Sequence, residues 1–376
     1  MLSEKFFIEC SDDIVEVYNQ YTDSIIEKMA YEIKALGKLD NIERQARLAI
    51  SAGAIYDDMI AKLAKLTQRS QSEIRKLLSK TATTSLEVDD QIYRNAGFDP
   101  APIHQSPVML QIMTAIASST NQDLNNMVKT SARATSNMFM QTLNEAFMQT
   151  ATGALDYNTA ITSAIKKLAT FGTVVDYPSG ASSQLDVAVR RCVLSGVSNA
   201  TNHLQLERAN EFGALYADTS AHSGARPSHQ EWQGMRFRLS DAEGVNMDYP
   251  HFINDDFGTE NKPVFEQLDD ANCRHSWYPV MYDEEPLAYT KEYIDEINNK
   301  RVYYGGKEYT AFEAEQRVRQ MERNVRRFRR QANALEIAGL DNSFEINKVR
   351  YWSGEIKSFC SVTGIQRRYV NERVYY

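Results

Sequence analysis

The sequence predicts a mainly α-helical protein that carries a small α+β module. Apolar residues recur every three or four positions over most of residues 1–212 and again after residue 309, as they do in amphipathic helices. Between residues 213 and 308 this period is lost, and short alternating runs are separated by Gly and Pro. We therefore expect N-terminal helical hairpins or a bundle, a loop-rich α+β domain and C-terminal arginine-rich helices.

The N-terminal helical region is predicted at residues 1–105. A first helix is indicated by apolar residues that end just before Gly37, a residue suited to a helix C-terminus. These apolar residues are Ile14, Tyr18, Tyr21, Ile25, Met29, Ile33 and Leu36. A second run comprises Ile55, Met59, Leu63 and Leu66. Ser70-Gln-Ser-Glu73 has the pattern of a capping box, which predicts that a third helix begins there and ends near Gly97.

A second helical region is predicted at residues 106–212. It is separated from the first by Asp99-Pro-Ala-Pro102, which breaks the helical pattern and predicts a linker. The expected helices cover residues 106–152, 157–171 and 184–212, with a turn at Pro178 and Gly180 before the last of them. Their Met-rich and polar stripes are typical of packing surfaces, either within the chain or between subunits.

The α+β module is predicted at residues 213–308. Strands are expected at residues 214–219, 235–239 and 276–282, and a hairpin at residues 302–306. The C-terminal basic region, residues 309–376, begins with the clearest helix of the chain and ends with a further helical stretch. The first of these helices carries an apolar seam with alternating spacings of four and three: Ala314, Val318, Met321, Val325, Phe328, Ala332 and Leu335.

Composition and charge narrow the class of protein. The chain has 376 residues, of which 43% are hydrophobic and 24% charged, so we expect an ordered protein of two or three domains. We expect neither a signal peptide nor a membrane span, and the four scattered cysteines are typical of reduced thiols in a cytoplasm. The net charge of −8 is uneven: residues 300–376 carry +7 and the remainder −15. A basic end suits contact with an anion, either nucleic acid or an acidic subunit.

Two loop segments concentrate the residue types that carry specific roles. The first runs from His222 to Gly234 and reads His-Ser-Gly-Ala-Arg-Pro-Ser-His-Gln-Glu-Trp-Gln-Gly. The second runs from Asn272 to Pro279 and reads Asn-Cys-Arg-His-Ser-Trp-Tyr-Pro. Together they hold three of the six histidines and one of the four cysteines. A loop-rich site between helical regions is where a specific role is expected.

These two motifs resemble those of the tailed-phage minor capsid protein 2 family, which is related to the Mu F-like head-morphogenesis proteins. The motif residues are His222, Gly224, Arg226, Pro227, His229, Trp232, Gln233, Gly234, Asn272, Cys273, Arg274 and His275. The resemblance extends to Tyr177-Pro-Ser-Gly180, Val189-Arg-Arg191, Ser195-Gly-Val197 and Tyr309–Gln316. One segment departs: Phe265–Ala271 stands where a Gly-rich approach to the second motif is expected, so the local turn should differ.

The resemblance implies a structural role in a phage head. Such a protein is expected on the inner side of the capsid near the portal vertex, in several copies per virion, after assembly in the bacterial cytoplasm. It would act in head assembly or genome packaging. The implied partners are the portal protein, the major capsid or scaffold protein, and packaged DNA through phosphate contacts. On this reading the protein is not an enzyme and contacts no membrane.

A metal site is one alternative for the motif residues. Zinc binds Cys and His in sets of four, and His222, His229, Cys273 and His275 are the candidates. Their spacings, His-x6-His and Cys-x-His, are uncommon for zinc, and only one thiolate is available. We therefore expect no cofactor, with the histidines bonded to turns around a small core that contains Trp232 and Trp277.

Catalysis is the other alternative. Cys273 lies beside Arg274 and His275, which could activate a thiol, and a virion-carried nuclease or transferase would use this cluster. No third group that would orient a base is identifiable, so we expect no catalytic residue. Arg226 and Arg274 are instead expected to tie loops together through their planar sets of donors.

The arginines of the C-terminal helix form a third candidate site. They are Arg317, Arg319, Arg323, Arg326, Arg327, Arg329 and Arg330, and they are expected on the outer faces of the helix, away from the apolar seam. Only Glu322 opposes them within this stretch, so an anionic surface should face them. DNA or an acidic partner protein would meet this need. Any DNA contact would be to phosphates and sensitive to salt, as in a non-catalytic head-completion factor.

Overall fold

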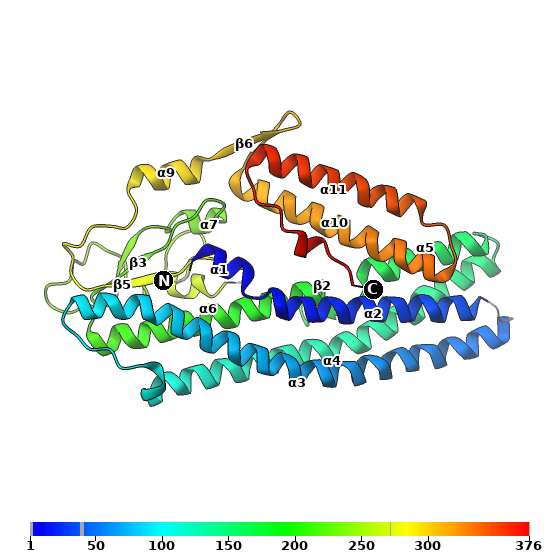
Figure 1. Cartoon of the computed structure of the whole chain (residues 1–376), viewed down its shortest axis with the longest axis horizontal. Helices are drawn as coiled ribbons and strands as arrows, with labels where there is room; N and C mark the ends of the chain where they lie inside the picture. The colour runs from blue at the N-terminus through cyan, green and yellow to red at the C-terminus, as the bar shows by residue number, and fades with distance from the viewer. Residues whose placement is uncertain (1–2, 38–40, 271, 376) are drawn as a thin grey trace. The chain divides into compact units, whose positions relative to one another are not determined.

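The computed structural model describes residues 3–37, 41–270 and 272–375, and it confirms the predicted fold class. The chain is 67% helical, and its described strands form three small antiparallel sheets (Figure 1). It divides into two compact units, each assembled from three segments. Unit 1 comprises Met1–Ser11, Gln71–Gln122 and Arg191–Glu315, and unit 2 comprises Asp12–Ser70, Asp123–Arg190 and Gln316–Tyr376. This division cuts across the four regions expected from the sequence.

Unit 2 is a helical bundle. Its complete helices are α2 (Asp12–Leu36), α5 (Tyr157–Phe171) and α11 (Ser343–Thr363). It also contains parts of α3 (Asn41–Asn95), α4 (Pro107–Ala151), α6 (Leu185–Phe212) and α10 (Ala311–Ala338). The seven apolar residues predicted for the first helix are all buried on α2. Helix α5 packs on α2, and two residues beyond the end of α5 the hydroxyl oxygen of Thr173 lies 2.6 Å from that of Thr22.

The predicted helix start at Ser70 is wrong, because α3 continues through it without a break. The run between Gly53 and Gly97 contains neither Gly nor Pro, so nothing in it forces the helix to end. Ser70 is buried, and its hydroxyl lies 3.4 Å from that of Tyr18. A buried packing position thus keeps Ser70 inside the helix despite its capping pattern.

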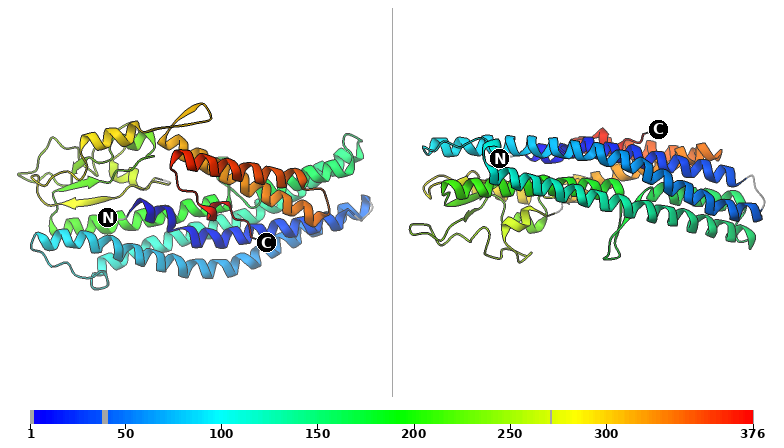
Figure 2. Two further views of the ribbon diagram at one scale, coloured as in Figure 1. Left: turned by 45° about the horizontal axis from the view of Figure 1, so that its top comes forward. Right: turned by 90° about the horizontal axis from the view of Figure 1, so that it is seen from below.

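The apolar seam of α10 is buried along its whole length, as its heptad spacing predicts. Figure 2 shows α10 and α11 lying side by side, and the rings of Phe328 and Phe344 join them in an edge-to-face contact 6.4 Å apart. A short 3₁₀ turn, η2 (Tyr369–Glu372), follows α11. Its Asn371 and Glu372 bond to α10 through Arg326 and Arg329, so the end of the chain packs on this helix.

Unit 1 contains a three-stranded antiparallel sheet. The central strand β3 (Tyr216–Thr219) pairs with β4 (Arg236–Arg238) on one side and with β5 (Trp277–Val280) on the other, so the three predicted strands are confirmed. The hairpin β6 (Arg301–Tyr304) and β7 (Lys307–Thr310) is confirmed as well. Unit 1 also contains the short helices α1 (Glu4–Glu9), α7 (Pro227–Gln230), α8 (Val264–Leu268) and α9 (Lys291–Asn299).

Several elements were not expected, among them the short helices of unit 1. The strands β1 (Val174–Asp176) and β2 (Ser182–Gln184) pair around the predicted turn at Pro178 and Gly180, and η1 (Ile103–Gln105) lies in the predicted linker. Helix α8 occupies most of the segment that departs from the family pattern, whose last residue, Ala271, lies outside the described residues. Elements of three to five residues are too short to show a hydrophobic period.

An aromatic core holds the sheet of unit 1 to α8 and to the ends of α3 and α6. Trp232, Phe237, Phe252 and Trp277 are fully buried in it. This core supplies the rigid support for the two loop motifs.

None of the helices formed by the described residues is both long and apolar enough to cross a membrane.

Candidate functional site

The two sequence motifs meet beside the central strand of unit 1. In the first motif, Pro227 occupies the first turn of α7, where its missing N–H costs nothing, and His229 follows on the same short helix. In the second, Asn272 adopts a left-handed conformation with φ of 64°. Asn tolerates this conformation better than most residues, and it turns the chain so that Cys273 and His275 lead into β5.

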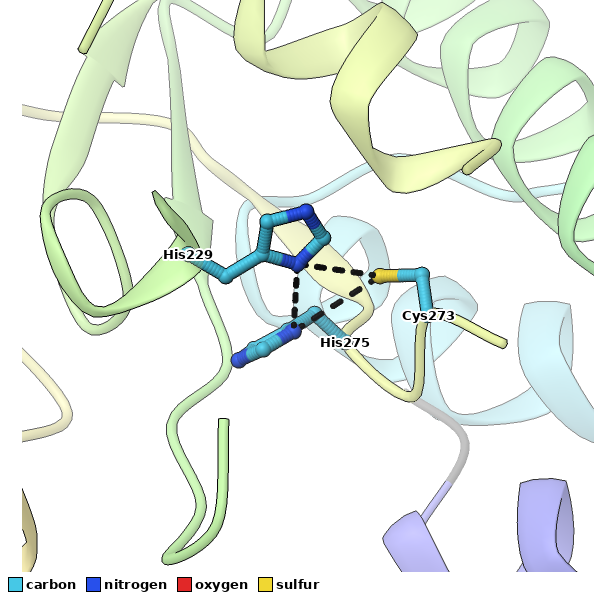
Figure 3. Close-up of side chains that lie close together, drawn as sticks. All are labelled: His229, Cys273 and His275. Atoms are coloured by element: carbon cyan, nitrogen blue, oxygen red, sulfur yellow. Dashed lines mark hydrogen bonds between the residues drawn. The ribbon is translucent and has the colours of Figure 1, made fainter. Parts of the chain in front are cut away.

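Three side chains from these motifs present their donor atoms to one another (Figure 3). The Nδ1 atoms of His229 and His275 are 3.4 Å apart, and the Sγ of Cys273 lies 3.7 Å from the first and 3.6 Å from the second. All three residues are buried, at 1%, 4% and 2% exposure for His229, Cys273 and His275. The structure therefore brings together three of the four candidate metal ligands.

The fourth candidate, His222, lies beside this triangle without entering it. Its ring stacks on that of His275, with centroids 4.2 Å apart, and its Nδ1 lies 3.1 Å from the carbonyl oxygen of Ser223. It covers one face of His275. His222 therefore packs against the triangle and is not one of its three donors.

Burial keeps these groups uncharged in the absence of a cation. It lowers the pKa of His229 to about 3 and that of His222 to about 4, and it holds the pKa of His275 well below its usual value. Burial also raises the pKa of Cys273 to about 12. An enclosed, protonated thiol is a poor nucleophile, which argues against a catalytic role for Cys273.

Two carboxylates that sequence reasoning missed face the outer nitrogen of His229. Its Nε2 lies 3.7 Å from both Glu260 Oε1 and Asp270 Oδ2. The two carboxylates share Lys262, whose Nζ lies 2.6 Å from Asp270 and 3.3 Å from Glu260, and Ser228 donates a 2.6 Å hydrogen bond to Glu260. Asp270 could have been noticed because it lies two residues before the second motif, but nothing in the sequence singles out Glu260.

Gln233 and Trp232 hold the first motif in place. The Gln233 Oε1 accepts from the backbone N–H of His222 at 3.0 Å and lies 3.2 Å from the Nε2 of His275. The indole N–H of Trp232 donates to Gln267 at 2.7 Å, and its ring packs 4.7 Å from that of His275. These contacts fix the position of the His275 ring and of the backbone at His222.

The two motif arginines connect segments within unit 1. Arg274 forms ion pairs with Glu4 on α1 and with Glu315, at 2.7 and 2.8 Å. Arg226 lies 3.7 Å from Asp270. These contacts place both side chains where they can hold loops together, the role expected for them.

Two glycine-to-alanine substitutions, one in the first motif and one in α11, test whether the first motif requires the left-handed backbone conformation of its glycine. Gly234 has a φ of +74°, and a Cβ there would meet Ile294 Cδ1 at 2.4 Å, so Gly234→Ala should lower the free energy of unfolding by about 1–2 kcal/mol. Gly354 lies inside α11 with open space around it, so Gly354→Ala should raise that free energy by about 0.5–1 kcal/mol. Urea denaturation of both variants measures the difference. Equal effects of the two substitutions would contradict the account.

The expectation for the arginine-rich helix needs correction, because three of its seven arginines bond to parts of unit 2 outside α10. Arg330 is only 2% exposed and donates to Asp23 on α2 at 2.6 Å, rather than lying on an outer face. Arg326 pairs with Asp186 at 3.2 Å, and Arg329 donates to the carbonyl of Glu372 at 2.8 Å. Two acids and one backbone carbonyl of the chain itself thus bind arginines of this helix.

Of the other four arginines, Arg323 is exposed and the remaining three are half-buried. Arg317 bonds to Gln320 at 2.8 Å and lies over the ring of Trp352, and Arg327 lies over the ring of Phe328. Helix α10 therefore does not present a continuous row of unpaired arginines to a partner.

A family model described as phage minor capsid protein 2 matches residues 2–361, which is nearly the whole chain. No curated protein and no solved structure matches the chain.

Proposed function

This chain belongs to the phage minor capsid protein 2 family, and from that membership we propose that it sits on the inner side of the capsid near the portal vertex and acts in head assembly or genome packaging. The family match is the observation that carries this proposal. The family name supports a structural component of the virion.

The proposal treats the protein as non-enzymatic. Its support is the buried state of Cys273 and the absence, among the described residues, of an exposed nucleophile held by the histidines of the motifs. We do not propose DNA contact through α10, because Arg326, Arg329 and Arg330 bond inside unit 2.

A surface on α11 supports contact with another head protein. Phe344, Tyr351 and Val362 are exposed, and their spacing of 7 and 11 residues places them on one face of the helix. Lys348 lies over the rings of Phe344 and Tyr351, at 5.4 and 5.7 Å, as it would at the edge of an interface. Exposed apolar residues grouped on one helix face are typical of protein-binding surfaces. We call these three residues the α11 face and propose that portal, major capsid or scaffold protein binds it.

Truncation of the α11 face should reduce incorporation into heads. A phage that lacks the wild-type gene would be complemented with Tyr351→Ala/Val362→Ala, and the copies per purified head counted by mass spectrometry. Both side chains are more than half exposed, at 54% and 62%, so the fold should be kept. We expect incorporation to fall about tenfold or more, because anchor residues of an interface contribute about 1–2 kcal/mol or more each.

Lys357→Ala is the matched control, since Lys357 is exposed about 120–140° around α11 from the α11 face. It should be incorporated like the wild type. Normal incorporation of the double variant would remove the α11 face from the proposal. Absence of the wild-type chain from purified heads would overturn the proposed function itself.

A further inference from the structure

The donor atoms of His229, Cys273 and His275 are spaced as a tetrahedral zinc ion requires. Zinc binds nitrogen at about 2.0–2.1 Å and thiolate sulfur at about 2.3 Å, which places neighbouring ligand atoms about 3.3–3.6 Å apart. The corresponding separations here are 3.4, 3.6 and 3.7 Å (Figure 3). The spacing fits before any movement of the side chains.

The hydrogen bonds of Gln233 fix the tautomer of His275. Gln233 Nε2 donates to the Oδ1 of Asn298 at 2.6 Å, and Gln233 Oε1 accepts from the backbone N–H of His222. The amide oxygen, which has no hydrogen, therefore faces the Nε2 of His275 at 3.2 Å. That nitrogen must carry the hydrogen, and the Nδ1 of His275 is left with a bare lone pair.

The Nδ1 of His229 is also expected to carry no hydrogen. Its Nε2 has no hydrogen-bond partner among the described residues, but it faces Glu260 and Asp270 at 3.7 Å. Two acceptors at this distance favour a hydrogen on Nε2 electrostatically, which leaves Nδ1 bare. Carboxylates placed behind the outer nitrogen of a histidine are typical support for a metal ligand.

The Nδ1 atoms of His229 and His275, neither of which carries a hydrogen, therefore both face the thiol of Cys273. Cys273 has a single hydrogen and can satisfy only one of the two Nδ1 atoms, and no other N–H or O–H in the described ranges bonds to either of them. An unsatisfied buried acceptor costs about 1–3 kcal/mol. A cation at the centre of the triangle satisfies all three donor atoms together.

We propose that His229, Cys273 and His275 bind one zinc ion through the two Nδ1 atoms and the sulfur. On binding, the thiol releases its proton to solvent, and both imidazoles bind as neutral ligands. One thiolate and two imidazoles suit zinc, and a zinc ion with three protein ligands binds water in its fourth position. The ion ties α7 to the segment before β5. This inference does not rest on the proposed function.

A second group of possible ligands, His229 with Glu260 and Asp270, is less suited to a metal. Both carboxylates are bound by Lys262, and Glu260 is also bound by Ser228. A cation is therefore already present at these oxygens. The sulfur-containing triangle is therefore the better candidate for a metal site.

The zinc content of the full-length chain tests the proposal. The reduced protein would be incubated with zinc and dialysed, and zinc per chain measured by elemental analysis together with affinity by chelator competition. We expect one zinc per chain in the wild type and in Cys360→Ser, which alters another buried thiol on α11. Cys273→Ser should lose more than the ~10–100-fold in affinity that loss of a group supporting a metal ligand costs. Equal zinc binding by Cys273→Ser and the wild type would overturn the proposal.

Cobalt replaces zinc in a second measurement that needs no variant. The wild-type protein loaded with Co²⁺ should show a thiolate-to-cobalt charge-transfer band and the visible bands of a tetrahedral complex. Circular dichroism of the same sample establishes that the protein is folded. A folded wild-type protein that shows neither band after loading, or that binds no zinc, refutes the site even if Cys273→Ser fails to fold.

Discussion

Replacing Arg330 by alanine is expected to lower the free energy of unfolding by about 3–5 kcal/mol, because it leaves a buried carboxylate without its partner. Arg330 donates to Asp23 at 2.6 Å and to Asn19 at 3.1 Å, and the side chains of the ion pair are 3% and 0% exposed. The backbone N–H of Tyr375 also donates to Asp23 at 2.8 Å. The pair thus joins α10, α2 and the end of the chain within unit 2.

Arg323→Ala is the control, because Arg323 is exposed on the same helix and its loss should change stability by no more than about 0.5 kcal/mol. Urea denaturation followed by circular dichroism compares the two variants. Asp23→Ala combined with Arg330→Ala should cost less than the sum of the single changes, since the pair acts as a unit. Equal stability of the Arg330 and Arg323 variants would show that Arg330 is a surface residue after all.

Trp232→Ala is expected to cost about 3–5 kcal/mol through the cavity left in the core of unit 1. Trp232 is fully buried, packs 4.7 Å from the rings of both His229 and His275, and donates to Gln267. Its loss would leave Gln267 Oε1 unpaired and free two of the proposed zinc ligands to move. The same substitution should therefore lower zinc affinity as well as stability.

Trp352→Ala is the matched tryptophan control. Trp352 is half-buried on α11, where it lies under Arg317 at 5.7 Å, so its removal should cost about 1 kcal/mol. Thermal unfolding monitored by circular dichroism ranks the two variants. A Trp232 variant as stable as the Trp352 variant would contradict the view that the first motif is built around a packed core.

The long helices could be predicted because their evidence is local. Regular apolar spacing locates α2, α5 and α10, and the spacing that defines the seam of α10 matches its buried residues. The three strands of the unit 1 sheet were also predicted from short alternating runs. Where the prediction failed, distant packing decided the outcome. Ser70 resembles a helix start, but a contact with Tyr18, 52 residues earlier, keeps it inside α3.

The candidate site was predicted as a set of residues but not as an arrangement. The motifs pointed to four possible ligands, and no spacing rule could show that His222 would stack on His275 while His229 and Cys273 turned inward. Similarly, the partner of Arg330 is Asp23, which lies 307 residues away in the sequence. An arginine count along one helix cannot reveal a buried acid on another.

The most direct test of the proposed role is a cryo-EM map of the head vertex of the phage that encodes this chain, with the chain traced in the density. The account predicts density for it on the inner side of the capsid at the portal vertex, with the α11 face against portal, major capsid or scaffold protein. Heads whose vertex contains no density for the chain, or density only on the outer surface, would contradict it.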